Sequence, residues 1–316
     1  MVARRPRLRY NRRLPLLASI FTSDILPIFV VAGVGFLLAR HFGANVRTLS
    51  TIAFNALSPC FVFTQLVTAQ ISASQSMRIA ALCVLLTATV GVAAWLVAIP
   101  LRLDRVTRSS FLLVVMFSNS GNYALPVVLF AFGREALAFA SVYFVCAAMM
   151  IYTAGIVVAG SGHGSVRVAV ARLFRVPALY AVAAAAAVLA THAAVPQPVM
   201  RPIALLGDAA IPVMLLVLGM QLERAILPAR PDGVVAAVVL SLFVTPLLAF
   251  GLATLLGVTG AARQAAIIES SMPAAVVTTV IALEFELDAA FTTSVVFFTT
   301  ILSPITLVLL IAYLQR

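Results

Sequence analysis

The sequence predicts an all-α integral membrane protein with ten transmembrane helices. Of its 316 residues, 63% are hydrophobic and only 10% are charged, and the mean hydropathy is +1.13. Soluble domains carry about 25% charged residues, so a chain this poor in charge cannot cover itself with a polar surface. A membrane-spanning helix needs about 20 apolar residues, and ten such helices joined by short loops account for most of the chain.

Ten apolar segments follow one another, and almost all charged residues lie between them. The expected helices are 24–40, 48–70, 77–100, 109–131, 137–160, 177–195, 203–222, 233–257, 262–283 and 289–313. Glycine and serine dominate 160–165, which is typical of a flexible joint between two sets of five helices. The expected parts are a basic tail (1–23), a first half (24–160), a linker (161–176) and a second half (177–316). Asp24 is interpreted as the N-terminal cap of the first helix.

The net charge of +11 comes from 21 basic residues, all of them arginine, spread over short loops and the N-terminal tail. This distribution is typical of a membrane surface and argues against a nucleic-acid partner. Cys60, Cys83 and Cys146 lie in apolar segments without Cys-x-x-Cys spacing, which predicts neither disulfide nor metal. The sequence contains no nucleotide-binding loop, zinc motif or nucleophile elbow, so we expect no cofactor and no enzyme activity.

The loop arginines predict an orientation in the cell inner membrane. Loops after odd-numbered helices hold most of them, so by the positive-inside rule these loops are cytoplasmic and both termini are periplasmic. Six arginines within 1–13 oppose this assignment, because they favour the cytoplasm. We give the loops more weight, since they sum over the whole chain.

Prolines recur at matching places in the two halves. Pro59 and Pro126 lie in the second and fourth helices, and Pro212 and Pro273 lie in the second and fourth helices of the second half. Corresponding proline-interrupted helices indicate two inverted repeats, here of five helices each. We expect helix breaks at all four prolines.

The fourth expected helix contains a short polar run that ends in a proline. Asn119, Ser120 and Asn122 precede Pro126, with Gly121 among them. Irregular backbone at membrane depth is tolerated where it lines a cavity or is packed in protein. One interpretation is an anion site, with the N-terminus of the second half-helix supplying N–H groups and positive dipole. The other is a structural kink whose asparagines bond across a helix interface.

The ninth expected helix has the same layout, with Ser270 and Ser271 shortly before Pro273. If the halves are inverted copies, the two breaks meet near the membrane midplane and their half-helix N-termini converge. The asparagine amides and serine hydroxyls are then the candidate donors to a carboxylate.

Two carboxylates lie within apolar segments, four residues before a proline: Glu269 before Pro273 and Asp208 before Pro212. Carboxylates within a membrane are costly and are often functional, so both are candidates for carrying a coupled proton. The structural alternative is a carboxylate that holds a helix break in shape. For Asp208, near a membrane face, the structural interpretation is favoured.

At these motifs the sequence resembles the auxin efflux carrier family, which includes bacterial dicarboxylate transporters and plant auxin exporters. The resemblance extends over nearly the whole chain after residue 24. The matching stretches are 119–126, 132–136, 206–220, 272–276 and 302–307.

The resemblance implies two inverted five-helix repeats, crossed fourth and ninth helices, and an elevator motion. It also implies that Asn119 helps to hold the substrate carboxylate. The long cytoplasmic loop of the plant exporters is absent between 160 and 175, which leaves auxin itself in question as the substrate.

We therefore expect a secondary transporter or uniporter of a small organic anion in the lipid bilayer. A proton gradient or the membrane potential would drive it, because no ATP site is visible. A sodium-coupled symporter of the bile-acid type is the alternative, and a membrane sensor or intramembrane enzyme is less consistent with these motifs. Substrate, direction of transport and oligomeric state stay open, with a homodimer as one alternative.

Overall fold

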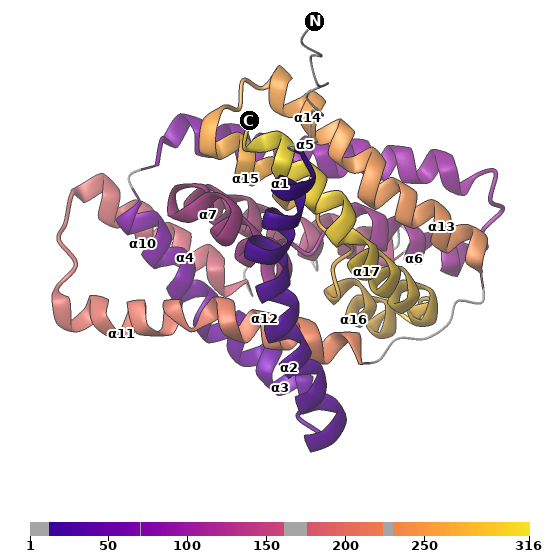
Figure 1. Cartoon of the computed structure of the whole chain (residues 1–316), viewed down its shortest axis with the longest axis horizontal. Coiled ribbons are helices and arrows are strands. Elements are labelled where there is room, and N and C mark those ends of the chain that lie inside the picture. The colour runs from indigo at the N-terminus through magenta and orange to yellow at the C-terminus, as the bar shows by residue number, and fades with distance from the viewer. Residues whose placement is uncertain (1–12, 70, 161–175, 224–229) are drawn as a thin grey trace, which may run out of the picture.

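A computed structural model describes residues 13–69, 71–160, 176–223 and 230–316. These parts are helical, and their β-type pairing is a single antiparallel bridge between Ser118 and Ala274 (Figure 1). The basic tail up to residue 12 and nearly all of the expected linker lie outside the described residues. Several long helices contain one π-helical turn, labelled η, that joins two α-helical stretches.

Helices before the expected linker follow in this order: α1 (Arg13–Ile20), η1 (Phe21–Ile25), α2 (Leu26–Phe42), α3 (Val46–Ile52), η2 (Ala53–Leu57), α4 (Ser58–Thr68), α5 (Ala73–Ala98), α6 (Arg105–Met116), η3 (Ser120–Ala124), α7 (Leu125–Met150), η4 (Ile151–Gly155) and α8 (Ile156–Ala159). Helices after it are α10 (Pro177–Thr191), α11 (Gln197–Asp208), α12 (Ala210–Leu222), α13 (Pro231–Val239), η5 (Leu240–Val244), α14 (Thr245–Leu255), α15 (Gly260–Ser270), α16 (Val277–Glu284) and α17 (Ala289–Leu314).

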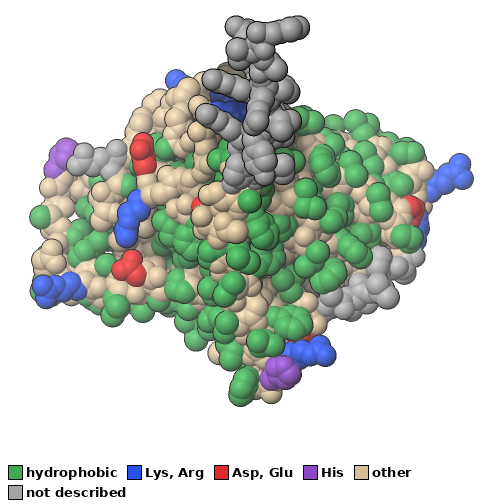
Figure 2. Space-filling view, in the orientation of Figure 1, with side chains coloured by type: hydrophobic (Ala, Val, Ile, Leu, Met, Phe, Trp, Pro, Cys, Tyr) green, Lys and Arg blue, Asp and Glu red, His purple; other side chains and the backbone are tan. Residues whose placement is uncertain are grey.

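Seven helical stretches of the described chain are long and apolar enough to cross a membrane. They are Leu16–Phe42, Val46–Thr68, Ala73–Ala98, Ser120–Ala159, Gln197–Leu222, Pro231–Leu255 and Ala289–Leu314. The surface agrees with this, because hydrophobic side chains cover most of the face in Figure 2 while charged ones lie mostly toward its margins. The protein is thus an all-helical integral membrane protein.

The 40-residue stretch Ser120–Ala159 is bent at Gly133, whose φ of 78° and ψ of −167° are not helical. Only glycine adopts this backbone conformation without steric cost, because any side chain would clash with its own backbone. The bend falls between the fourth and fifth segments expected from the sequence.

The helices pack as two groups. In the first, which we call the α2–α12 group, α2 packs along α12, and α4 packs against α10 and α11. In the second, which we call the crossing group, α7 packs against α5 and α15, and α17 packs against α6 and α13. The two groups meet where α12 contacts η3, α4 contacts α7 and α1 contacts α17. In Figure 1, α4, α10 and α11 lie on one side of the view and α6, α13, α16 and α17 lie on the other.

Two glycines set the close approach of α2 to α12. A Cβ atom on Gly35 would collide with the backbone of Leu216, and one on Gly219 would collide with the backbone of Ala32. Small residues let helix backbones approach closely, and this contact maximises van der Waals packing between helices in a membrane. The α2–α12 group therefore has a rigid central contact.

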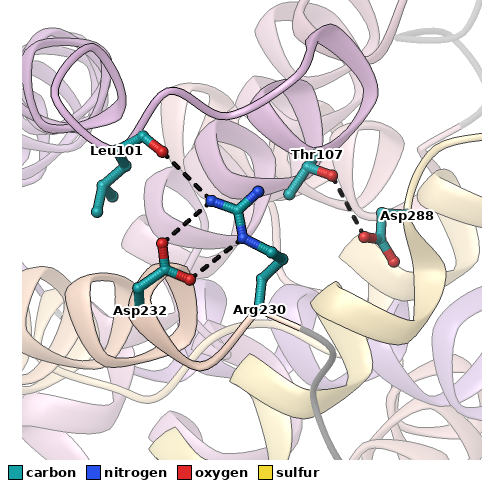
Figure 3. A network of polar contacts seen from close by, with 5 residues as sticks. All are labelled: Leu101, Thr107, Arg230, Asp232 and Asp288. Atoms are coloured by element: carbon teal, nitrogen blue, oxygen red, sulfur yellow. Dashed lines mark hydrogen bonds and ion pairs between the residues drawn. The ribbon is translucent and has the colours of Figure 1, made fainter.

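One end of the crossing group is held by contacts among loops and helix starts (Figure 3). The Arg230 guanidinium donates to the Leu101 carbonyl at 3.3 Å and to the Asp232 carboxylate at 3.0 and 3.2 Å. Nearby, the Thr107 hydroxyl donates to the Asp288 carboxylate at 3.4 Å. These contacts tie the starts of α6, α13 and α17 together.

Three sequence-based expectations about helix geometry were wrong. Asp24 does not cap a helix start, because the helix already includes Arg13 and Asp24 lies in the π-helical turn η1. Pro59 does not break its helix: it occupies the first turn of α4, directly after the π-helical turn η2, where a missing N–H is accommodated. Pro212 also lies within a helix, in the first turn of α12. The interruption in this region is a single residue, Ala209, which separates α11 from α12 before the proline is reached.

Candidate functional site

Two interrupted helices meet in the crossing group. The first interruption separates α6, which ends at Met116, from η3, which begins at Ser120. Phe117 is extended, with φ −121° and ψ 111°, and Asn119 is also non-helical. The second separates α15 from α16, between Ser270 and Val277. Both interruptions lie in polar runs that the sequence singled out.

The two interruptions pair with each other through a single antiparallel bridge between Ser118 and Ala274. The Asn119 N–H donates to the Pro273 carbonyl at 2.8 Å, and the Ala275 N–H donates to the Phe117 carbonyl at 2.9 Å. Backbone groups freed from helical hydrogen bonds must find partners when buried away from water. Here each broken helix supplies partners for the other, so neither break is stable alone.

Side chains supplement this backbone pairing. The Ala274 N–H donates to the hydroxyl oxygen of Thr299 on α17 at 3.2 Å. The Ser118 hydroxyl donates to the Glu269 carbonyl at 3.0 Å. Neither Ser118 nor Thr299 was assigned to the expected site. Ser118 lies in the polar run before Pro126, whereas Thr299 is one of several threonines and serines in its apolar helix and nothing in the sequence distinguishes it.

The two prolines contribute differently from each other. Pro273 lies in the extended segment, and its carbonyl is a partner of the other break. Pro126 lies in the first turn of α7, and the chain is already helical from Ser120 through the π-helical turn η3. The missing Pro126 N–H cannot bond within the helix, and a π-helical turn accommodates this loss without ending the helix. The first break therefore lies well before its proline.

Asn119 is a buried donor at the crossing that is left without a partner. Its side chain is 5% exposed, and its Nδ2 atom has no hydrogen-bond partner among the described residues. A buried amide without a hydrogen-bond partner is costly, so this Nδ2 group is a candidate donor to a ligand. Ser120 is also buried, whereas Asn122 is half-buried.

The serine hydroxyls of the second break are already used. The Ser270 hydroxyl donates to the carbonyls of Ala266 and Ile267, and the Ser271 hydroxyl donates to the Ile267 carbonyl. In this conformation their protons are not available to a bound anion. The second break therefore presents helix amides but no free hydroxyl donor from these two residues.

Each break is followed by a helix that begins at the crossing, and some of its first N–H groups are already engaged. The N–H groups of Ser120, Thr278 and Thr279 donate to the carbonyls of Ser118, Ala275 and Val276. The first amides of a helix lack acceptors within it and carry about half a positive charge in sum. Gly121 lets η3 approach the part of α7 that follows the Gly133 bend, because a Cβ atom there would lie 2.9 Å from the Phe144 ring. No basic residue occurs in 117–126 or 269–277, so positive potential at the crossing comes from helix ends.

Glu269 is fully buried, at 0% exposure, and neither carboxylate oxygen has a hydrogen-bond partner among the described residues. Asp208 differs: it is exposed at the last residue of α11, which packs on α4. The structure therefore places one of the two candidate carboxylates next to the crossing and the other on a different helix group. The described residues contain no cluster of three histidine, cysteine or acidic side chains suited to a metal ion.

A small cavity of about 20 Å3 lies beside the crossing, with room for about one water molecule. Ser118, Met272 and Ala274 line it from the two breaks. An organic anion is much larger than this space, so this cavity does not hold one in the present conformation.

Comparison with known proteins gives the chain its family. The family model described as membrane transport protein matches residues 20–168 and 163–311. An uncharacterized transporter of Methanothermobacter thermautotrophicus is 27% identical over 292 residues, covering 90% of this chain and 96% of that protein. An uncharacterized transporter of Methanocaldococcus jannaschii is 26% identical over 305 residues, with the same coverage of the two chains. The chain therefore belongs to the membrane transport protein family, the auxin efflux carrier-like family that its motifs resemble.

Proposed function

We propose that this transporter moves a small organic anion across the cell inner membrane, and that the anion binds at the crossing of the two broken helices. The observation that supports this most strongly is the unpartnered Asn119 amide, buried where the backbones of two interrupted helices pair. An anion placed there would accept a hydrogen bond from Asn119 and from the first amides of the following helices. A carboxylate has the acceptor oxygens for this geometry.

The charge at the crossing favours a monocarboxylate over a dicarboxylate. Two helix N-termini supply about half a positive charge each, which balances one negative charge. Residues 117–126 and 269–277 contain no arginine or lysine that could balance a second. The fully buried Glu269 carboxyl would repel any anion unless it is protonated. We therefore infer that Glu269 is the proton-coupling residue and that proton and anion move together.

The packing of the helices supports an elevator motion within two inverted five-helix repeats. The ten spans in this proposal are the seven long stretches, with Ser120–Ala159 counted as two at the Gly133 bend, together with α10 and the broken α15–α16. α6 belongs to the span that continues into η3. The crossing group would move as one body against the α2–α12 group, whose glycine-mediated contact keeps it rigid. Both termini would lie in the periplasm.

Transport by purified protein in proteoliposomes tests this function. Uptake of radiolabelled acetate, benzoate, indole-3-acetate and succinate is measured with an imposed pH gradient, a sodium gradient or neither. We expect pH-driven uptake of at least one monocarboxylate and weaker uptake of succinate. Uptake that requires sodium would instead support the symporter alternative, and no uptake of any of these anions would contradict the proposal.

Asn119→Ala provides the residue-level test, with Asn55→Ala as the matched control. Asn55 is an exposed asparagine in η2 whose amide donates to the Thr51 carbonyl of its own helix. Loss of a hydrogen bond to a charged group costs about 1.5–3 kcal/mol, so Asn119→Ala should reduce affinity about 10- to 100-fold. Asn55→Ala should transport as the wild type does. Equal transport by both variants would remove Asn119 from the site.

A further inference from the structure

Two residues four positions apart on α17 each bond to a different broken helix. The Thr299 hydroxyl oxygen accepts from the Ala274 N–H of the second break at 3.2 Å. The Ser303 hydroxyl is hydrogen-bonded to the hydroxyl of Tyr123 in η3 at 3.1 Å. Residues four positions apart in an α-helix lie on the same face, one turn from each other. One face of α17 therefore contacts both broken helices and sets their positions relative to each other.

Pro304 gives the Ser303 hydroxyl a second partner. Pro304 lies inside α17 and has no N–H group, so the Thr300 carbonyl lacks the donor that an α-helix supplies four residues later. The Ser303 hydroxyl donates to this carbonyl at 2.8 Å. A hydroxyl has one proton and a carbonyl oxygen can only accept, so the Tyr123 hydroxyl is the donor in the bond to Ser303. The hydrogen bonds thus run from Tyr123 to Ser303 and from Ser303 to the Thr300 carbonyl.

Tyr123 is fully buried, at 0% exposure, and contacts both helix groups. Its ring packs edge-on against the Phe29 ring of α2, in the α2–α12 group, with 6.0 Å between the centroids and 88° between the planes. Its hydroxyl bonds to Ser303 of α17, in the crossing group. A buried hydroxyl is costly unless it is hydrogen-bonded. The polar and the apolar contact are separable, because removal of the hydroxyl alone leaves the ring in place.

Tyr123 lies one π-helical turn after Asn119. The Ala124 N–H, next in the chain after Tyr123, donates to the Asn119 carbonyl at 3.1 Å across this turn. The Asn119 N–H donates to the Pro273 carbonyl at 2.8 Å. Both backbone groups of Asn119 are therefore held, while its side-chain amide has no partner among the described residues. A shift of η3 away from α17 would move this amide, since only one turn connects it to Tyr123.

We propose that Tyr123 and Ser303 are positioning residues of the anion site: their hydrogen bond fixes η3 on α17 and thereby holds the Asn119 amide where it donates to the anion. Neither hydroxyl proton is free for the anion itself, because both are used within the chain of hydrogen bonds. A donor that is already held in place binds more tightly than a mobile one, since less conformational freedom is lost on binding. The proposal rests on the proposed function, in which Asn119 donates to the anion.

A double-mutant cycle between Tyr123 and Asn119 tests this positioning. KM and maximal rate are measured for uptake of acetate, benzoate and indole-3-acetate into proteoliposomes. For Tyr123→Phe, which keeps the ring contact with Phe29, we expect KM to rise about three- to tenfold, the range that one neutral hydrogen bond contributes. The maximal rate should stay within about twofold of the wild type. In the Asn119→Ala background the same substitution should raise KM less than about twofold, because no amide is left to position.

Ser303→Ala removes the acceptor of the Tyr123 hydroxyl and should give the same pattern in both backgrounds. It keeps the proposal testable if Tyr123→Phe does not fold. Tyr313→Phe, at an exposed tyrosine of α17, is the control and should keep the wild-type KM.

A purely structural role would lower the maximal rate, because less protein is folded, or would change KM by the same factor in both backgrounds. Either result would overturn the positioning role, and so would an unchanged KM in folded Tyr123→Phe or Ser303→Ala. If the wild type takes up none of the three anions, or if Asn119→Ala transports as the wild type does, the proposed function fails instead. The two failures are therefore distinguishable.

Discussion

The two breaks look alike in the sequence but differ in what they contribute. The first presents a buried donor without a partner, the Asn119 amide. The second has both of its serine hydroxyls engaged by α15 and supplies backbone groups and the neighbouring Glu269 carboxylate instead. The difference teaches that a repeated motif does not imply repeated chemistry. In the proposed function, the first break holds the anion, and the second pairs with the first and carries the proton.

The largest expected effect comes from exchanging the donor of the first break for an acceptor. Asn119→Asp preserves shape but removes the N–H group and adds negative charge beside the anion. Binding should weaken by about 100-fold or more, because a charged hydrogen bond is lost and repulsion is added. Ser271→Ala should change binding less than about twofold, since its hydroxyl is used within α15. Ligand-induced rises in melting temperature measure both variants, and equal losses would mean that the breaks share the donor role.

The second-largest expected effect is a difference in transport between substitutions of Pro273 and Pro126. Pro273→Ala allows α15 to continue as a helix, which competes with the pairing of the Pro273 carbonyl and the Asn119 N–H. We expect transport to fall about tenfold, equivalent to about 1.4 kcal/mol against the paired state. Pro126→Ala lies inside an existing helix and should change transport less than about twofold. Flux in proteoliposomes gives the comparison, and a stronger effect at Pro126 would refute it.

A third test addresses the support of the second break by α17. Thr299→Val removes the acceptor of the buried Ala274 N–H, which should cost about 1–3 kcal/mol of stability. Thr300→Val is the matched control, because the Thr300 hydroxyl donates only to the Val296 carbonyl of its own helix. Thermal unfolding in detergent should show a clearly lower melting temperature for Thr299→Val alone. Similar melting temperatures of the two variants would show that Thr299 does not stabilise the second break.

The smallest expected effect concerns the start of the helices that lead into the breaks. The Asp104 carboxylate accepts from the Val106 and Thr107 N–H groups at the start of α6, whereas Thr259 makes no such cap for α15. Asp104→Ala should cost about 1 kcal/mol and Thr259→Ala much less. Thermal unfolding at neutral pH would contradict this if the two variants were equally stable.

The Asp104 cap also predicts a pH dependence. The backbone N–H groups hold the pKa of this carboxyl below its ordinary value. Its stabilisation is therefore fully present above the ordinary aspartate pKa of about 3.9 and is lost as the pH falls through the lower folded value. The difference in melting temperature between wild type and Asp104→Ala should shrink only in that acidic range. A difference that is constant down to the lowest pH would exclude the carboxylate as its source.

The candidate site was predictable where composition itself was unusual. Asn119, Ser120 and Pro273 stand out because polar and helix-breaking residues are costly inside apolar segments. Thr299 could not be found this way, since serines and threonines recur along its apolar helix and the sequence marks none of them. Its partner, the Ala274 N–H, belongs to the second break and not to this helix. The position of the first break was also missed, because the proline was taken as its cause.

The sequence alone determined that this chain is a helical membrane protein and where its helices are weakest, because hydrophobicity and backbone chemistry act locally along the chain. Only the tertiary structure decided which weak points become open breaks. Pro59, Pro126 and Pro212 remain within helices. The segments around Asn119 and Pro273 open because each finds in the other the hydrogen-bond partners that a lone broken helix in an apolar environment lacks.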